Sequence, residues 1–283
     1  MTDKGTYRIR AMSRGELEIA VHWAAAEGWN PGRGDAGIFF ATDPLGFLTG
    51  VLDQAPIATI SAVRYGIGFG FIGFYIVDKK WRGQGYGMLL WRAAMARLAD
   101  VACIGLDGVL QEEASYRRSG FVTSHRNRRY GGRPPKFVGA KHVVDARDVA
   151  FRLILDFDRR MFPAPRDGFL AQWIGAPGHR ALAVAGATGL AGFGVARPST
   201  DGFKIGPLYA TDRATAESLL RALCDGMGDG PAFLDVPEVN AEAVRLAESL
   251  GWTPAFETVR MYRGPAPAID LERLYGVTTF ELG

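Results

Sequence analysis

Short blocks of alternating apolar and polar positions fill the first half of the chain, and longer amphipathic blocks separate them. A helix is predicted over about residues 14–27, followed by a polar turn cluster at 28–32. Short β-rich segments bounded by Asp, Pro and Gly predict strands at 38–41, 46–52, 57–63 and 70–77. A helix over about 84–100 and a strand over 104–109 follow. The order of elements is helices first, then successive strands, then a strand–helix–strand unit. This order predicts a mixed α/β arrangement rather than a doubly wound one.

The second half repeats this plan. Strands are predicted at 203–210 and 232–236, and each precedes an amphipathic helix. The two halves are in register, because the pairs Gly120/Gly251 and Arg82/Arg213 are both separated by 131 residues (251 − 120 and 213 − 82). An internal duplication is therefore predicted.

The turn between the strand at 70–77 and the following helix is rich in glycine. Glycines allow a tight backbone turn with several N–H groups facing one point, and a helix start adds unpaired donors and a partial positive charge. This combination predicts a phosphate or pyrophosphate site. Neither the nucleotide P-loop nor the dinucleotide-binding spacing is present. The predicted cofactor-binding residues of the turn are Arg82, Gly83, Gln84, Gly85, Tyr86 and Gly87.

A second motif, Tyr116-Arg-Arg-Ser-Gly-Phe, follows about thirty residues later. The two motifs together resemble the Arg-x-x-Gly-x-Gly and Tyr-x-x-x-Gly-Phe segments of the GNAT acetyltransferases. The resemblance implies acetyl-CoA as the co-substrate, with the pyrophosphate on the glycine turn and Tyr116 beside the CoA sulfur. It adds Tyr75, Ile76 and Val77 on a splayed strand to the cofactor-binding residues. One departure is Val109, where many members of the superfamily have Asn; Gln111 is the nearest amide.

Segments at 28–32, 106–109, 206–210, 234–237 and 260–264 look like those of bacterial tandem GNAT proteins. The fold class expected from this resemblance is α/β (α+β type), with two tandem GNAT-like domains, each a mixed, mostly antiparallel sheet flanked by helices. Residues 1–140 would form the catalytic domain and 141–283 a degenerate domain that shapes the acceptor pocket. In the second copy Ala214, Ala216 and Ser218 stand where the first has glycines, and Ala247 where it has Tyr116. A non-catalytic second copy is therefore expected, with a separate CoA site in it as the alternative.

Acyl transfer to an amine needs a base, because a lysine-like amine with a pKa of about 10 is mostly protonated at neutral pH. Glu27 is the first candidate for the base and Asp107 the second; each has an alternative interpretation as a solvated or capping carboxylate. Tyr116 is the candidate donor to the leaving thiolate, with a core aromatic as the alternative. The candidate acceptor-binding residues are Trp29, Asn30, Tyr65 and Asp107.

Composition narrows the function further. The chain has 283 residues, with 33 basic against 30 acidic side chains and a net charge of +3, so no dense basic tract favours a nucleic-acid partner. No apolar stretch approaches the ~20 residues of a membrane helix. Two cysteines without metal-like spacing and no secretory leader favour a cytoplasmic protein with no metal site.

The main hypothesis is an acetyl-CoA-dependent N-acetyltransferase that acts on a small-molecule amine by direct transfer. Two alternatives remain: an acyl-CoA-binding sensor or scaffold, which would not need Tyr116, and transfer to a protein lysine or N-terminus, which would need an open groove. The sequence does not indicate the oligomeric state or the identity of the acceptor.

Overall fold

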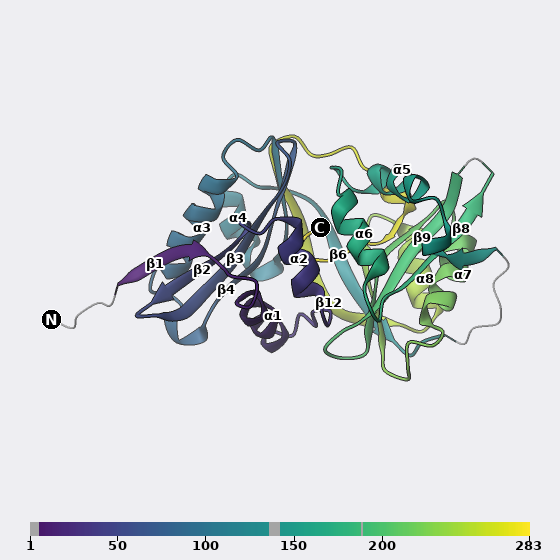
Figure 1. Cartoon of the computed structure of the whole chain (residues 1–283), viewed down its shortest axis with the longest axis horizontal. Helices are drawn as coiled ribbons and strands as arrows, with labels where there is room; N and C mark the ends of the chain where they lie inside the picture. The colour runs from purple at the N-terminus through teal and green to yellow at the C-terminus, as the bar shows by residue number, and fades with distance from the viewer. Residues whose placement is uncertain (1–5, 136–141, 188) are drawn as a thin grey trace.

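The computed structural model describes residues 6–135, 142–187 and 189–283 as two similar halves joined by one sheet (Figure 1). The first half contains β1 (Tyr7–Ala11), α1 (Leu17–Ala26), α2 (Asp35–Thr42), β2 (Phe47–Leu52), β3 (Ala55–Tyr65), β4 (Phe69–Val77), α3 (Tyr86–Arg97), β5 (Cys103–Val109), α4 (Glu113–Arg118) and β6 (Val122–Gly132). The second half contains β7 (Val143–Asp145), α5 (Phe151–Met161), α6 (Asp167–Gly175), β8 (Arg180–Gly186), β9 (Gly189–Pro198), β10 (Phe203–Ala210), α7 (Arg213–Cys224), β11 (Ala232–Pro237), α8 (Ala241–Ser249), β12 (Thr253–Arg263) and β13 (Leu274–Gly276).

Most of the predicted elements are confirmed, and one is wrong. Residues 38–41, predicted as a strand, belong to helix α2. Four apolar residues in a row fit either a buried strand or a buried helical turn, and here tertiary packing decides. Phe39 is fully buried, and its ring stacks on that of Trp173 in α6 at a centroid distance of 6.1 Å.

The sheet exchanges strands between the halves. Within the described residues, thirteen strands form one sheet in the order β1-β2-β3-β4-β5-β12-β6-β11-β10-β9-β8-β7, with β13 beside β10. Strand β12 of the second half lies antiparallel between β5 and β6, with Thr258 opposite Val109. Strand β6 of the first half pairs on its other side with β11. The predicted division at 140/141 lies outside the described residues and stays a prediction.

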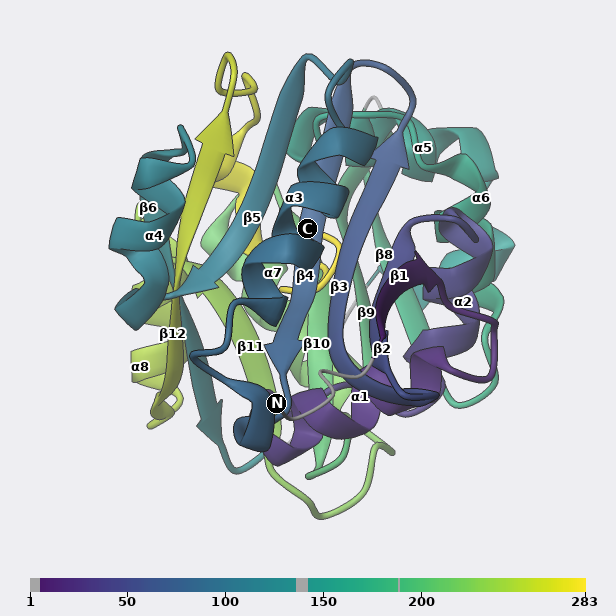
Figure 2. The same ribbon diagram turned by 90° about the vertical axis from the view of Figure 1, so that its left-hand side faces the viewer.

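Three buried clusters hold helices to this sheet. Helix α3 covers β3 and β4, as Figure 2 shows, through a cluster that includes Leu90 and Trp91. Helices α7 and α8 cover the second half through a cluster that includes Leu219 and Leu246. The largest cluster takes buried side chains from α1, α2, α5 and α6 together. Because its apolar surface comes from both halves, hydrophobic burial stabilises their union as well as each half.

The segment 274–283 connects equivalent places in the two halves, and all of its residues are buried. It begins as β13, which pairs with β10. Two glycines let it pass close to the sheet: a Cβ on Gly206 would lie 2.4 Å from the Thr278 carbonyl oxygen, and one on Gly73 would lie 2.2 Å from that of Glu281. Side chains at these positions would displace the segment.

Candidate active site

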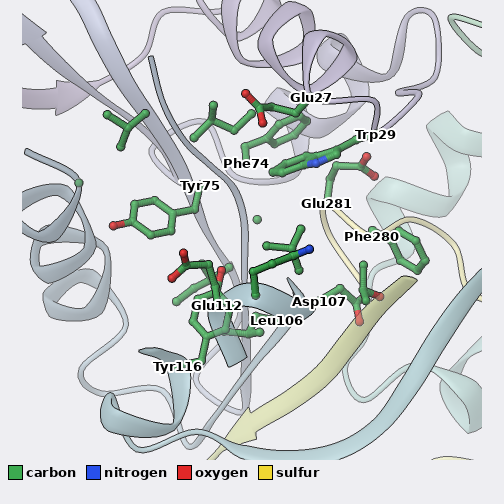
Figure 3. Close-up of a pocket in the computed structure, with 18 of the residues that line it drawn as sticks. Glu27, Trp29, Phe74, Tyr75, Leu106, Asp107, Glu112, Tyr116, Phe280 and Glu281 are labelled. Carbon is green, nitrogen blue, oxygen red and sulfur yellow. The ribbon is translucent and has the colours of Figure 1, made fainter. Parts of the chain in front are cut away.

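A cavity of about 800 Å³ opens where β4 and β5 separate. The two strands pair in parallel only from Phe69 opposite Cys103 to Ile72 opposite Leu106. Beyond Ile72 the β5-facing edge of β4 has no partner strand among the described residues, and Phe74 has a positive φ of 47°. The predicted cofactor residues Tyr75, Ile76 and Val77 line this opening (Figure 3 shows Tyr75). Unpaired backbone groups therefore border the cavity on its β4 side.

The glycine turn lies at one end of the cavity and opens helix α3. Gly83 and Gly85 have φ values of 75° and 90°, in the left-handed region that other residues rarely adopt. Gly85 is the N-cap residue, and among the described residues no side chain caps this helix start. Gly83, Gly85 and Gly87 line the cavity together with Arg82. The first turn of α3 therefore presents unpaired N–H groups to an anion.

The equivalent place in the second half is closed. The Asp212 side chain accepts a hydrogen bond from the Thr215 N–H, so helix α7 carries its own N-cap. Strands β10 and β11 also separate, but β13 fills the opening: Gly276 lies opposite Leu208, and the Val277 N–H donates to the Asp235 carbonyl. The chain itself thus occupies the gap that remains open in the first half.

Glu27, the first candidate base, is paired with the glycine turn. Its Oε1 accepts from Arg82 Nη2 at 2.6 Å, and Arg82 Nε donates to the Val77 carbonyl at 2.8 Å. The two side chains keep exposed fractions of 26% and 45%, so this ion pair is open to water. Glu27 lines the cavity, but its carboxylate is engaged by a cation.

Tyr116 extends from α4 to the cavity wall and is nearly buried. Its ring packs on Trp91 at a centroid distance of 5.6 Å. Burial raises the pKa of the phenol, and the charge of Glu112 and the Tyr75 hydroxyl add to the shift. Tyr116 is therefore protonated at neutral pH, as a donor to a leaving group must be.

Asp107 lies on the cavity wall, with its carboxylate bound to protein groups. Arg260 of the exchanged strand donates to both oxygens at 2.8 and 2.6 Å, and Asn127 donates to Oδ1 at 2.8 Å. The Asp107 side chain is fully buried. This bidentate pair fixes β12 against β5 and occupies both oxygens of Asp107, although burial raises the pKa of that carboxyl.

The structure separates the other predicted residues. Trp29 lines the cavity, whereas Asn30 binds the loop of the second half by donating to the Asp201 carbonyl at 3.0 Å. Tyr65 is in the core, where its hydroxyl donates to the Leu282 carbonyl at 3.1 Å. Gln84 and Tyr86 belong to the glycine turn but are not among the residues that line the cavity.

The sequence led us to expect that the second half shapes the acceptor pocket, but it did not identify which residues of that half line the cavity. Phe256 and Thr258 come from the exchanged strand β12, and Phe280 and Glu281 from the segment that follows β13. Figure 3 shows Phe280 and Glu281 across the cavity from Tyr75 and Tyr116. No local pattern marks these four residues, because only the long-range path of the chain brings them to the first half.

Comparison with known proteins agrees with this architecture. Residues 15–121 match the model of the acetyltransferase (GNAT) family, and residues 154–276 match a model of an acetyltransferase (GNAT) domain. The chain is 30% identical over 285 residues to a holothin acyltransferase of Pseudoalteromonas sp. (strain SANK 73390), covering 100% of this chain and 97% of that protein.

Solved structures share the fold. The crystal structure of a protein from Pyrococcus horikoshii superposes on this chain with a TM-score of 0.85 at 23% sequence identity. The match covers 100% of this chain and 98% of that one. A tandem GNAT protein from the clavulanic acid biosynthesis pathway has a TM-score of 0.62 at 16% identity, covering 92% and 100%.

Fold and site together define an acyltransferase. The chain belongs to the GNAT family of acetyltransferases and is a tandem member, with one GNAT domain in each half. Within the described ranges no helix is both long and apolar enough to cross a membrane, and no group of three or more His, Cys, Asp or Glu side chains is arranged to hold a metal ion.

Proposed function

We propose that this protein is an acetyl-CoA-dependent N-acetyltransferase that acylates a primary amine on a small molecule by direct transfer within a ternary complex. One observation carries the proposal: the first half keeps an open strand gap beside an uncapped helix start, and the second half closes both. The pantetheine arm would lie along β4, with the pyrophosphate on the glycine turn. One CoA molecule per chain is therefore expected.

Catalysis of this reaction depends on positioning the amine and the thioester, and it does not need a covalent intermediate on the enzyme. The amine nitrogen attacks the thioester carbonyl carbon, the C–N bond forms, and the C–S bond breaks as the tetrahedral adduct collapses. Unpaired N–H groups on the free edge of β4 stabilise the oxyanion, and Tyr116 passes its hydroxyl proton to the departing sulfur and regains a proton from the nitrogen of the adduct. Of the two protons that the ammonium loses, one ends on the thiol of CoA and the other in solvent.

A small acceptor is supported by the walls of the cavity. The second half lines the side opposite Tyr116 with Phe280 and adds Phe256 from β12, so the acceptor space has walls from both halves. The relative that shares 30% identity over the whole chain is named a holothin acyltransferase. Both features favour a small molecule over a protein lysine or N-terminus.

The test compares equivalent positions in the two halves by titration calorimetry with acetyl-CoA. Gly83→Glu places a carboxylate where the pyrophosphate would bind, and Ala214→Glu introduces the same side chain 131 residues later, at an exposed site in α7. Each lost hydrogen bond to a charged group costs about 1.5–3 kcal/mol, so Gly83→Glu should weaken binding about 100-fold or more. Ala214→Glu should bind like the wild type.

Two results would contradict the proposal. Equal weakening by both variants, or no measurable affinity of the wild type, would show that the glycine turn is not the CoA site. Tight binding without thiol release, across a panel of primary amines, would favour the acyl-CoA sensor instead.

A further inference from the structure

Four carboxylates line the cavity, and they differ in what surrounds them. Glu27 is paired with Arg82, Asp107 is bound by Arg260 and Asn127, and Glu112 is exposed to solvent. Glu281 is only 3% exposed, yet its Oε2 has no hydrogen-bond partner among the described residues. A buried carboxylate oxygen without a partner is costly to the fold, and because Glu281 lines the cavity, a rotation of its side chain toward an amine there would relieve that cost.

The backbone around Glu281 is held firmly on both sides. Before it, Thr278 Oγ1 accepts a hydrogen bond from Arg166 Nη2 at 2.8 Å. After it, the Leu282 N–H donates to Thr279 Oγ1 at 2.9 Å, and the Leu282 carbonyl accepts from the Tyr65 hydroxyl. These contacts fix the position of Glu281 while leaving its carboxylate oxygen Oε2 unsatisfied. The arrangement is typical of a functional group supported by a rigid frame.

The charges behind Glu281 are balanced. Arg129 on β6 and Lys204 on β10 interact electrostatically with it, and both also interact with Asp235 on β11. Arg129 binds both oxygens of Asp235 at 2.6 and 2.8 Å, and Lys204 Nζ lies 3.6 Å from Asp235 Oδ2. Arg197 also interacts with Lys204 and Asp235, and it is paired with Asp35. Three cations thus face three carboxylates when all six groups are ionised.

The surface beside Glu281 is aromatic. Trp29, Phe256 and Phe280 line this part of the cavity, and the Arg129 guanidinium lies 5.6 and 5.0 Å from the two phenylalanine ring centres. Thr258 also lines the cavity, and its buried Oγ1 has no hydrogen-bond partner among the described residues. An apolar wall that also contains the carboxylate residue Glu281 suits an apolar or aromatic molecule that carries an amine.

We propose that Glu281 is the catalytic base and that the acceptor is a compact apolar or aromatic amine, with its nitrogen on Glu281 and its body against Trp29, Phe256 and Phe280. This inference rests on the proposed acyltransfer from acetyl-CoA. Glu281 takes one proton from the ammonium, which frees the nitrogen lone pair to attack the thioester carbonyl carbon. The protonated carboxyl then releases that proton to solvent once the product leaves, so the group is restored for the next turnover.

The experiment uses the full chain, acetyl-CoA, and tryptamine, phenethylamine and spermidine as acceptor probes, with thiol release as the readout. Glu281→Gln keeps the shape of the side chain and removes the base. It should lower kcat about 100-fold or more, abolish the acid limb of the pH profile of kcat/KM, and leave the acetyl-CoA Kd within about twofold. Glu281→Asp should recover part of kcat. Tryptamine and phenethylamine should be better acceptors than spermidine.

The matched control is Glu272→Gln, an identical change at an exposed site two residues before β13, which should behave like the wild type. Retention of kcat and of the pH profile in Glu281→Gln, with only reduced stability, would assign Glu281 a structural role and overturn the inference. Preference for spermidine would overturn the acceptor class. Failure of the wild type to bind acetyl-CoA is a different result, because it would remove the proposed function itself.

Discussion

Arg166 is the anchor of the segment that carries Glu281, and its replacement offers a quantitative test. Its guanidinium is bidentate with Asp158 at 2.7 and 3.0 Å and also donates to Thr278 Oγ1 and the Tyr209 hydroxyl. Both charged side chains are almost completely buried, at 1% and 2% exposed. Burial disfavours the Arg166 cation, but the charge of Asp158, its hydrogen bond to Arg166, and the Tyr209 and Tyr65 hydroxyls together more than offset it, and the net pKa is raised.

Arg166→Met keeps much of the side-chain volume but leaves Asp158 as a buried, unpaired charge. Removing one partner of a buried ion pair costs about 3–5 kcal/mol. At about 2.1 cal/mol/K of unfolding entropy per residue, that loss corresponds to a fall in Tm of about 5–8 °C for a chain of this length. Adding Asp158→Asn should recover about 2 kcal/mol, because the uncompensated charge is then gone.

The assay is urea unfolding of the wild type, both single variants and the double variant, with Arg159→Met as the control. Arg159 directly follows Asp158 in the sequence, but its side chain is half exposed. Its ion pairs with Asp167 and Asp156, at 3.5 and 3.7 Å, should be worth less than about 1 kcal/mol. Hydrogen exchange over 274–283 should speed up in Arg166→Met and in the double variant, because both lack the bond to Thr278, and should not change in Arg159→Met. A loss below about 1 kcal/mol, or a double variant no more stable than Arg166→Met, would refute this account of the anchor.

Two further predictions concern single side chains. Tyr116→Phe should lower kcat about 100-fold while the acetyl-CoA Kd stays the same, as measured by thiol release and calorimetry; an unchanged kcat would exclude the phenol from the mechanism. Burial, and then the Arg197 charge, lower the pKa of His179 to about 4, and its Nδ1 lies 2.8 Å from the Trp173 carbonyl. The unfolded chain takes up the proton first, so about 3 kcal/mol of stability should be lost as the pH falls from 6.5 to 4. His179→Asn should flatten that dependence in urea unfolding at several pH values, whereas parallel curves would contradict it.

Local sequence patterns predicted the parts of the fold that depend on neighbouring residues. The strand–turn–helix from β4 to α3 could be predicted because apolar periodicity, glycines and a helix start lie within thirty residues. The same pattern indicated that the second copy had lost its glycines. The structure adds the physical reason for a closed gap there: Asp212 caps α7, and β13 fills the space beside β10.

What the sequence could not reveal depends on residues far apart in the chain. Glu281 lies 165 positions after Tyr116 (281 − 116), and nothing near it in sequence indicates that it reaches the same cavity. Glu27 was the first candidate base because it ends a helix near the expected site, but the sequence could not show its pairing with Arg82. Charge pairing across 55 residues is a property of the folded chain alone.

The exchange of β6 and β12 limits how the two repeats can evolve separately. A first repeat expressed apart would leave β6 without either neighbour and β5 with a bare edge, and exposed strand edges recruit other chains into aggregates. A second repeat expressed apart would lack the strand that lies between β11 and β12. Neither half-gene encodes a finished sheet, so recombination cannot shuffle the repeats as independent modules, and selection acts on the pair as one unit.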